Sequence, residues 1–171
     1  LETADALAAL EEGGPFDLVV AQQFMDLVDQ ERTLAAVTDA LAPGGLAYFP
    51  LTFDGETVFQ PAHPLDSAVV DAYHATMDRR LQGDSRAGRH LASRLQRGPG
   101  ELLVVAPADG IVRPRDGAYP ADEQYFLDRI LDFVADELTD ADLSGFDEWL
   151  ETRRAQVRRE ELFYVAHRYD L

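Results

Sequence analysis

The chain has 171 residues, with 32 Asp and Glu against 15 Arg and no Lys, which gives a formal net charge of −17. This acidity argues against a nucleic-acid partner, because phosphate contacts need clustered cations. No apolar run approaches the roughly 18 residues of a membrane span, and no basic segment followed by an apolar stretch marks a signal peptide. We therefore expect a cytoplasmic protein that does not act at a membrane.

Two further features of the composition limit the chemistry. Because there is no cysteine, disulfides, thiolate metal sites and cysteine nucleophiles are excluded, and no His or carboxylate motif has the spacing of metal ligands, so we predict no metal. Uniform acidity without Lys is typical of a halophilic protein, in which salt screens the self-repulsion. A GC-rich coding bias towards Ala, Arg, Asp and Gly is the alternative explanation.

The length fits a single domain with one core, and the 46% hydrophobic fraction excludes a disordered acidic tail. The chain begins at Leu1 instead of Met, within sequence that already has the pattern of ordered structure. We interpret residues 1–171 as the later part of something longer.

The first third of the sequence predicts a strand–helix–strand unit. The apolar and β-branched run Phe16–Ala21 predicts a strand buried on both faces. A helix follows with Asp29 as its N-cap, and Pro43-Gly44-Gly45 ends it. The second strand covers Leu46–Phe53. Because the connecting segment is long enough for a right-handed crossover, the two strands should be parallel neighbours.

The rest of the chain alternates between helices and short extended segments. A short helix is expected before the strand–helix–strand unit, and helices and two further strands are expected after it. In chain order these predicted elements are a helix at Thr3–Glu12, a loop at Gly55–Pro64, a helix at Asp66–Leu81, a short helix ending at Arg97, a strand at Leu102–Ala106, an extended piece at Ile111–Pro114, helices at Asp122–Leu138 and about Asp140–Arg159, and a strand at Leu162–His167.

The segment FDLVVA at Phe16–Ala21, followed by LAPGGLAYF at Leu41–Phe49, resembles the fourth and fifth strands of class I S-adenosylmethionine-dependent methyltransferases. The later order of elements is similar too, with a sixth strand at Leu102–Ala106 and a closing seventh strand at Leu162–His167. The resemblance implies an α/β fold: a partial Rossmann-like methyltransferase sheet, mostly parallel with an antiparallel C-terminal strand, and helices on both faces. Another doubly wound α/β protein with a Pro-Gly-Gly turn is the alternative.

Two parts of that family's cofactor site have no counterpart in this sequence. These are the glycine-rich first loop, which lets the backbone approach the cofactor's methionyl end, and the acidic residue after the second strand, which holds the ribose hydroxyls. The resemblance therefore implies that residues 1–171 are a single domain, the C-terminal portion of a methyltransferase-like domain, with a helical insert at about 83–100.

By resemblance, the cofactor S-adenosyl-L-methionine is held by two short segments. Ala4-Asp5-Ala6 looks like the family's turn whose carboxylate accepts a hydrogen bond from the adenine amino group; the alternative is that Asp5 or Thr3 only caps the first helix. The edge after the first strand faces the methionyl group and the adenine. Asp26 and Asp29, a little further on, are interpreted as the start of the next helix. The predicted cofactor-binding residues are Asp5, Ala21, Gln22, Gln23 and Phe24.

The edge after the second strand is where the family places its methyl acceptor, and aromatic residues with a few polar groups follow it here. His63 and His74 are the two candidates for a base near neutral pH, although a lone His is more often structural or solvated. No catalytic residue is assigned. The predicted substrate-binding residues are Thr52, Phe53, Phe59, His63, Tyr73 and His74.

A basic stretch of this acidic chain lies between Arg79 and Arg97. Surrounding acids make solvated ion pairs its default role. The alternative is that the segment Gly83–Gly100 covers the site and offers Arg to an anionic substrate.

The leading functional hypothesis is a methyltransferase, represented by its acceptor-side half, that methylates an unidentified small molecule. The alternative is a non-catalytic, methyltransferase-like interaction module that lacks the cofactor loop. In that case the strand at Phe16–Ala21 would carry an unpaired edge, which another copy, N-terminal residues or a partner must cover. A dehydrogenase or other nucleotide-binding α/β fragment is the third hypothesis.

Overall fold

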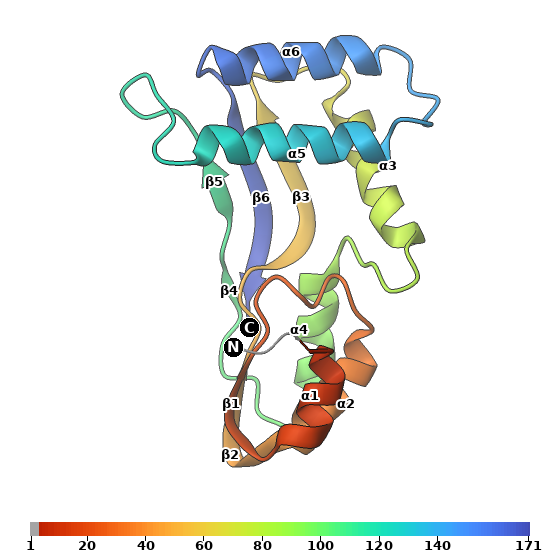
Figure 1. The fold of residues 1–171 in the computed structure, drawn as a ribbon, viewed down its shortest axis with the longest axis vertical. Helices are drawn as coiled ribbons and strands as arrows, with labels where there is room; N and C mark the ends of the chain where they lie inside the picture. Colours follow the sequence, from red (N-terminus) through yellow and green to blue (C-terminus); the bar gives the residue numbers. More distant parts are fainter. Residues whose placement is uncertain (1–3) are drawn as a thin grey trace. The chain divides into compact units, whose positions relative to one another are not determined.

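The computed structural model describes residues 4–171, which form two compact units (Figure 1). Unit 1 comprises residues 4–54, 81–108 and 168–171, and unit 2 comprises residues 55–80 and 109–167. None of the helices within residues 4–171 is long and apolar enough to cross a membrane.

Each unit has its own helices, and two strands contribute to both units. Unit 1 contains α1 (Ala6–Gly13), β1 (Phe16–Val20), α2 (Gln30–Ala40), β2 (Leu41–Tyr48), α4 (Ala87–Arg97) and β4 (Ala106–Pro107). Unit 2 contains α3 (Asp66–Arg79), β5 (Gly110–Val112), α5 (Glu123–Glu137) and α6 (Phe146–Arg158). The strands that contribute to both are β3 (Thr52–Gln60) and β6 (Phe163–Asp170).

The predicted strand–helix–strand unit is confirmed. β1 and β2 pair in parallel and form a two-stranded sheet, called sheet A, with Leu18 opposite Leu46 and Val20 opposite Tyr48. Asp29 caps the connecting helix α2, since its carboxylate accepts a hydrogen bond from the Arg32 amide at 3.0 Å. The crossover helix therefore brings the carboxyl ends of both strands to one edge.

The bounds of the second strand differ from the prediction. β2 begins at Leu41, directly after α2, and ends at Tyr48 instead of Phe53. The Pro-Gly-Gly segment belongs to this strand, where Gly44 has φ +80° and the pairing with β1 shifts register between Phe16 and Leu18. The prediction that Pro-Gly-Gly ends the helix is therefore wrong, because α2 stops at Ala40 with Leu41 as an extended C-cap. The glycines instead serve an irregular strand start.

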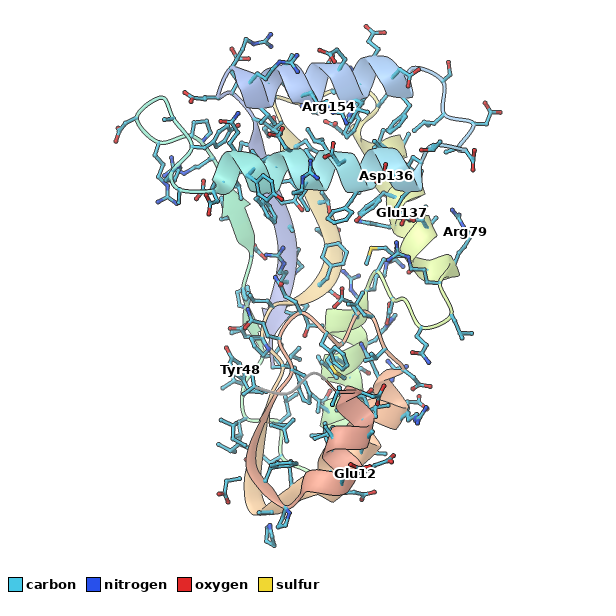
Figure 2. The ribbon with its side chains drawn as sticks, viewed as in Figure 1. Glu12, Tyr48, Arg79, Asp136, Glu137 and Arg154 are labelled. Carbon is cyan, nitrogen blue, oxygen red and sulfur yellow. The ribbon has the colours of Figure 1, made fainter. Side chains whose placement is uncertain are left out.

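Only one face of sheet A is buried, which corrects the prediction of a strand buried on both faces and of helices on both sides. Val19 and Ala47 pack against a core that contains Met25, Val37 and Leu91. On the other face, the cross-strand neighbours expose 41–56% of their surface, and Tyr48 points away from α1 and α2 in Figure 2. These exposed residues are Leu18, Val20, Leu46 and Tyr48.

The second sheet, called sheet B, has the strand order β3–β6–β4, and β5 also pairs with β6. β6 is antiparallel to β4 and β5, so the prediction of an antiparallel C-terminal strand is confirmed. Just beyond β6, Leu171 is buried in the core of unit 1, and its backbone exchanges hydrogen bonds with that of Phe49 after β2. The mutual exchange is the pattern of an antiparallel pair.

The secondary structure predicted for two segments near sheet B is wrong. Gly55–Pro64 is not a loop over its whole length, because β3 continues to Gln60 with buried Thr52, Asp54 and Phe59. Leu102–Ala106 is a strand only at Ala106, where β4 begins, and Leu103 to Val105 are exposed. The fold is mixed α/β with one parallel and one antiparallel sheet.

The helix predictions are close to the structure for α3, α4 and α5. The last helix is shorter than predicted, because α6 begins at Phe146 instead of Asp140. Residues 138–140 and 144–145 form turns, and Gly145 precedes the helix with φ +84°, a conformation that favours glycine.

The core of unit 2 is built around a fully buried arginine. The guanidinium of Arg153 forms an ion pair with Asp66 and donates to the Pro61 carbonyl at 2.7 Å. It lies 5.5 Å from the ring centre of Phe59 and 5.7 Å from that of Trp149. Because Trp149 also donates to the Asp66 carboxylate at 2.8 Å, one acidic side chain joins α3 to α6.

The Arg153→Ala variant should lose about 3–5 kcal/mol of unfolding free energy, because it leaves the half-buried Asp66 carboxylate without its cation. The adjacent Arg154 is the control, since it forms an ion pair with Asp132 at 2.9 Å at the surface of the same helix (Figure 2). Arg154→Ala should cost about 0–1 kcal/mol. Urea unfolding of both variants at one fixed salt concentration measures the difference, and equal losses would contradict this account of the core.

Candidate functional site

The candidate site is the edge of sheet A at which both parallel strands end. In open α/β sheets, ligands bind outside the carboxyl ends of the strands. The chain leaves β1 after Val20 and leaves β2 after Tyr48, and both exits lie at this edge. The start of α4 is bound to both exit segments. We call the polar residues there the carboxyl-edge cluster: Asp26, Gln30, Asp54, Asp84, Arg89 and His90.

Buried hydrogen bonds fix the start of α4 on the loop that follows β1. The side-chain amide of Gln30 donates to the Met25 carbonyl at 3.1 Å and to the Ala87 carbonyl at 3.0 Å. The Asp84 amide donates to the Asp26 carbonyl at 3.1 Å. The first turn of α4 therefore has a defined position at the carboxyl end of β1.

An ion pair with a buried carboxylate fixes the same helix start on the segment that follows β2. Asp54 is fully buried, and Nε of Arg89 donates to both of its carboxylate oxygens at 3.0 Å. The Arg89 amide also donates to Asp54 Oδ1 at 2.7 Å, and Nη2 donates to the Asp54 carbonyl at 3.1 Å. Such a bidentate pair supplies both charge compensation and a defined geometry.

Gly88 permits this close approach. A Cβ atom at this position would lie 2.6 Å from the Tyr169 ring and 3.0 Å from Cβ of Asp54. Both distances are shorter than normal packing, so the residue at position 88 must lack a side chain for Arg89 to reach Asp54. Sequence reasoning missed this cluster, although a glycine between the polar residues of Asp84-Ser85 and Arg89-His90 signals a close backbone approach.

Asp26 is the carboxylate of the cluster with a perturbed pKa. Burial raises its pKa from 3.8, opposed by hydrogen bonding to its own backbone and by the charge of Arg168, while the charge of Asp84 raises it further. Its Oδ1 atom is buried and has no hydrogen-bond partner among residues 4–171. Perturbed, incompletely satisfied carboxyl groups are concentrated at functional sites.

The predicted cofactor-binding edge has exposed side chains and occupied backbone amides. The amides of Ala21 and Gln23 donate to the carbonyls of Tyr48 and Pro50 at 3.0 and 3.1 Å. The side chains of Gln22 and Gln23 are exposed, whereas Phe24 packs against the core of unit 1. The segment therefore presents two exposed glutamine side chains, and its backbone amides at Ala21 and Gln23 are not available to a ligand.

Asp5 has the geometry of a helix N-cap, which was the alternative interpretation of this residue. Its carboxylate accepts hydrogen bonds from the amides of Leu7 at 3.1 Å and Ala8 at 3.0 Å, at the start of α1. Thr3, the other capping candidate, lies outside the described residues. The proposed contact of Asp5 with adenine remains a prediction.

The six predicted acceptor-binding residues fall in different units. Thr52 and Phe53 belong to unit 1, where Thr52 is fully buried and its hydroxyl donates to the Phe49 carbonyl at 3.1 Å. The other four belong to unit 2, where Phe59 is part of the aromatic core beside Trp149. The buried Thr52 and Phe59 therefore have packing roles in their own units.

The two predicted base candidates of unit 2 have different surroundings. Nδ1 of His63 accepts a hydrogen bond from the Leu65 amide at 3.2 Å, so this ring stabilises the turn before α3. Nε2 of His74 lies 3.4 Å from the Thr57 hydroxyl, and its ring centre is 6.1 Å from that of Tyr73. Tyr73 and His74 are thus neighbours on α3, both half-buried.

Most arginines of the basic stretch have acidic or polar partners. Arg80 pairs with Glu137 in unit 2, and Arg94 donates to Gln30 at 3.1 Å and approaches Glu31 at 3.6 Å in unit 1. The helix α4 packs into the core of unit 1 through Leu91, which is fully buried. These contacts agree with the ion-pair interpretation, and α4 is a core helix of unit 1.

A groove of about 520 Å³ lies between α1 and α2, away from the carboxyl edge, since Gly14 and Pro15 precede β1. Its lining residues are Leu10, Glu11, Gly14, Pro15, Arg32, Ala35, Ala36, Asp39 and Ala40. Over the described part of the chain, no group of three or more His, Asp or Glu side chains is arranged to hold a metal ion.

No model of a known protein family matches the chain, and no curated protein matches it. The functional interpretation therefore rests on the residues of the site and on the motif resemblance.

The Gly88→Ala variant should lose about 1–3 kcal/mol of unfolding free energy, because the added methyl group overlaps Tyr169. Gly100 is the matched control, since no atom lies within 4 Å of a Cβ added there. Gly100→Ala should change stability by less than about 0.5 kcal/mol. Denaturant unfolding of both variants tests the close approach, which an unaffected Gly88→Ala protein would refute.

The Asp26→Asn variant should be more stable than the parent at pH 7. The folded state holds the Asp26 proton more tightly than the unfolded state, so parental stability falls as pH rises above 3.8, and the neutral Asn avoids this loss. The advantage of the variant should shrink as pH falls from 7 towards 3.8. Asp29→Asn, which keeps the α2 cap, controls for the lost charge. An advantage that does not vary with pH would show that titration of Asp26 is not its cause.

Proposed function

We propose that this chain is the acceptor-side part of an S-adenosyl-L-methionine-dependent methyltransferase that acts on a small molecule. The observation that carries the proposal is the parallel β1–α2–β2 unit, with the L-x-P-G-G segment entering β2. The antiparallel C-terminal strand, whose end pairs with Phe49, agrees with the arrangement implied by the resemblance.

In this proposal the residues of the carboxyl-edge cluster line the reaction site. Gln22 and Gln23 offer exposed amide side chains for the polar parts of the methyl donor. S-adenosyl-L-methionine supplies, when bound, a methyl group on a cationic sulfur. The pair Asp54–Arg89 holds the start of α4 rigidly against the strand ends, and positioning of this kind accounts for much of the rate gain in group transfer.

A second candidate function is a non-catalytic interaction module, which the exposed apolar face of sheet A favours. Leu18 and Leu46 lie opposite each other on this face and expose 56% and 53% of their surface. Such a face suits a partner or a second copy, with the edge of β1 as the pairing strand. The two functions differ in whether the protein binds a methyl donor.

Isothermal titration calorimetry of the full natural polypeptide with S-adenosyl-L-methionine tests the proposal. A separate titration with NADH tests the dehydrogenase hypothesis. Binding of the methyl donor alone is the expected result. The double variant Gln22→Ala, Gln23→Ala should weaken that binding by about fivefold to tenfold, the effect of losing a hydrogen bond.

Gln124→Ala, at an exposed position on α5 in unit 2, is the control and should leave the affinity unchanged. Absence of binding to the methyl donor would reject the methyltransferase proposal and favour the interaction module. Binding of NADH alone would instead identify a dehydrogenase.

A further inference from the structure

A second feature of the carboxyl-edge cluster is a carboxylate–imidazole pair. Nδ1 of His90 lies 2.7 Å from Oδ2 of Asp84, and the other oxygen of Asp84 accepts from the Arg86 amide at 2.9 Å. Because an ionised carboxylate only accepts hydrogen bonds, the proton of the neutral ring lies on Nδ1. Nε2 is then the basic nitrogen, on a side chain that is 49% exposed.

The pair is held at the carboxyl end of β1. The Asp84 amide is bonded to the Asp26 carbonyl, and Gln30 joins the Met25 and Ala87 carbonyls on either side of this contact. His90 follows Arg89, whose contacts with Asp54 bind the same turn to the end of β2. The first turn of α4, which carries the imidazole, is therefore bound to the segments that follow both parallel strands, and ligands of such sheets bind beyond the strand ends.

We propose that His90, oriented by Asp84, is the proton acceptor for the methyl acceptor of this site; the inference rests on the proposed function. As the acceptor heteroatom forms its bond to the methyl carbon, Nε2 takes the proton of that heteroatom and becomes part of an imidazolium beside Asp84. The electron pair of the broken sulfur–carbon bond stays on sulfur, so the donor leaves as neutral S-adenosylhomocysteine. Charge and atoms balance without a further reactant.

This role restricts the class of substrate. A carboxylate is already ionised at neutral pH and needs no base, whereas an alcohol, a phenol or an amide nitrogen still carries its proton. A carboxylate-oriented imidazole is useful only for the second class. The site is therefore suited to a neutral O–H or N–H acceptor.

The chain offers a matched control in unit 2. Nδ1 of His167 lies 2.6 Å from Oδ1 of Asp109, so the chemistry of the pair is the same. This second pair adjoins the antiparallel β5–β6 pairing and belongs to unit 2, whereas the carboxyl-edge cluster belongs to unit 1. Its reactivity reports on a carboxylate–imidazole pair outside the proposed site.

The test measures acylation of each histidine by diethyl pyrocarbonate, using peptide mass spectrometry of the full natural polypeptide. Saturating S-adenosylhomocysteine with phenol as the acceptor probe should slow acylation of His90 about fivefold or more, because bound ligands bury most of the surface they cover. Acylation of His167 should not change. Calorimetry with S-adenosylhomocysteine runs in parallel, on the parent protein and on His90→Gln.

His90→Gln should bind S-adenosylhomocysteine within about twofold of the parent and should lose about a hundredfold or more of methyl transfer to phenol, since a general base contributes at least that factor. Binding without protection of His90, or a loss of affinity above tenfold in His90→Gln, overturns the inference and leaves the methyltransferase proposal standing. Absence of binding to the parent rejects both.

Discussion

β1 and β2 pair in parallel, and this pairing determines what the rest of unit 1 can do. It brings the two exit segments to one edge, so that Asp26 and Asp54 follow neighbouring strands although they are far apart in the sequence. The first turn of α4 then contacts both segments, through the Asp84 amide and through Arg89. The strand geometry therefore places these polar residues together at the edge where ligands of open α/β sheets bind.

Each unit contains a carboxylate–arginine pair in which one partner is fully buried, and the two pairs have similar consequences. Asp54–Arg89 fixes α4 in unit 1, and Asp66–Arg153 joins α3 to α6 in unit 2. Burying these charges costs desolvation, which the bidentate and multiple hydrogen bonds offset. Such pairs are therefore weak sources of net stability, but each admits only one arrangement of the elements that it joins.

The sequence predicted elements correctly where a local pattern of residues determines them. The run FDLVV and the Asp29 cap located β1 and α2 correctly, since a β-branched run and an N-cap are local properties. The predicted burial of both faces of β1 was wrong, because burial depends on tertiary contacts. Gly55–Pro64 was predicted as a loop, yet β3 continues through Gly55 to Gln60, because β6 supplies the pairing. The carboxyl-edge cluster escaped prediction for the same reason, since its members meet only through tertiary contacts. The apolar run Leu102 to Val105 shows the opposite error, because it was predicted as a strand but lacks strand pairing.

The acidity of the chain separates its charges into two kinds. Exposed pairs such as Arg158–Glu151 and Arg159–Glu161 lose most of their attraction in concentrated salt, because the screening length falls to about 3 Å at 1 M. Buried pairs are screened much less. In a protein with a net charge of −17, high salt therefore weakens the repulsion between surface carboxylates. It screens Asp54–Arg89 only in part, because the carboxylate is buried although the arginine is 48% exposed. The buried hydrogen bonds of Gln30 to the Met25 and Ala87 carbonyls, which also position α4 at the strand ends, carry no net charge and are of the kind that a saline environment preserves.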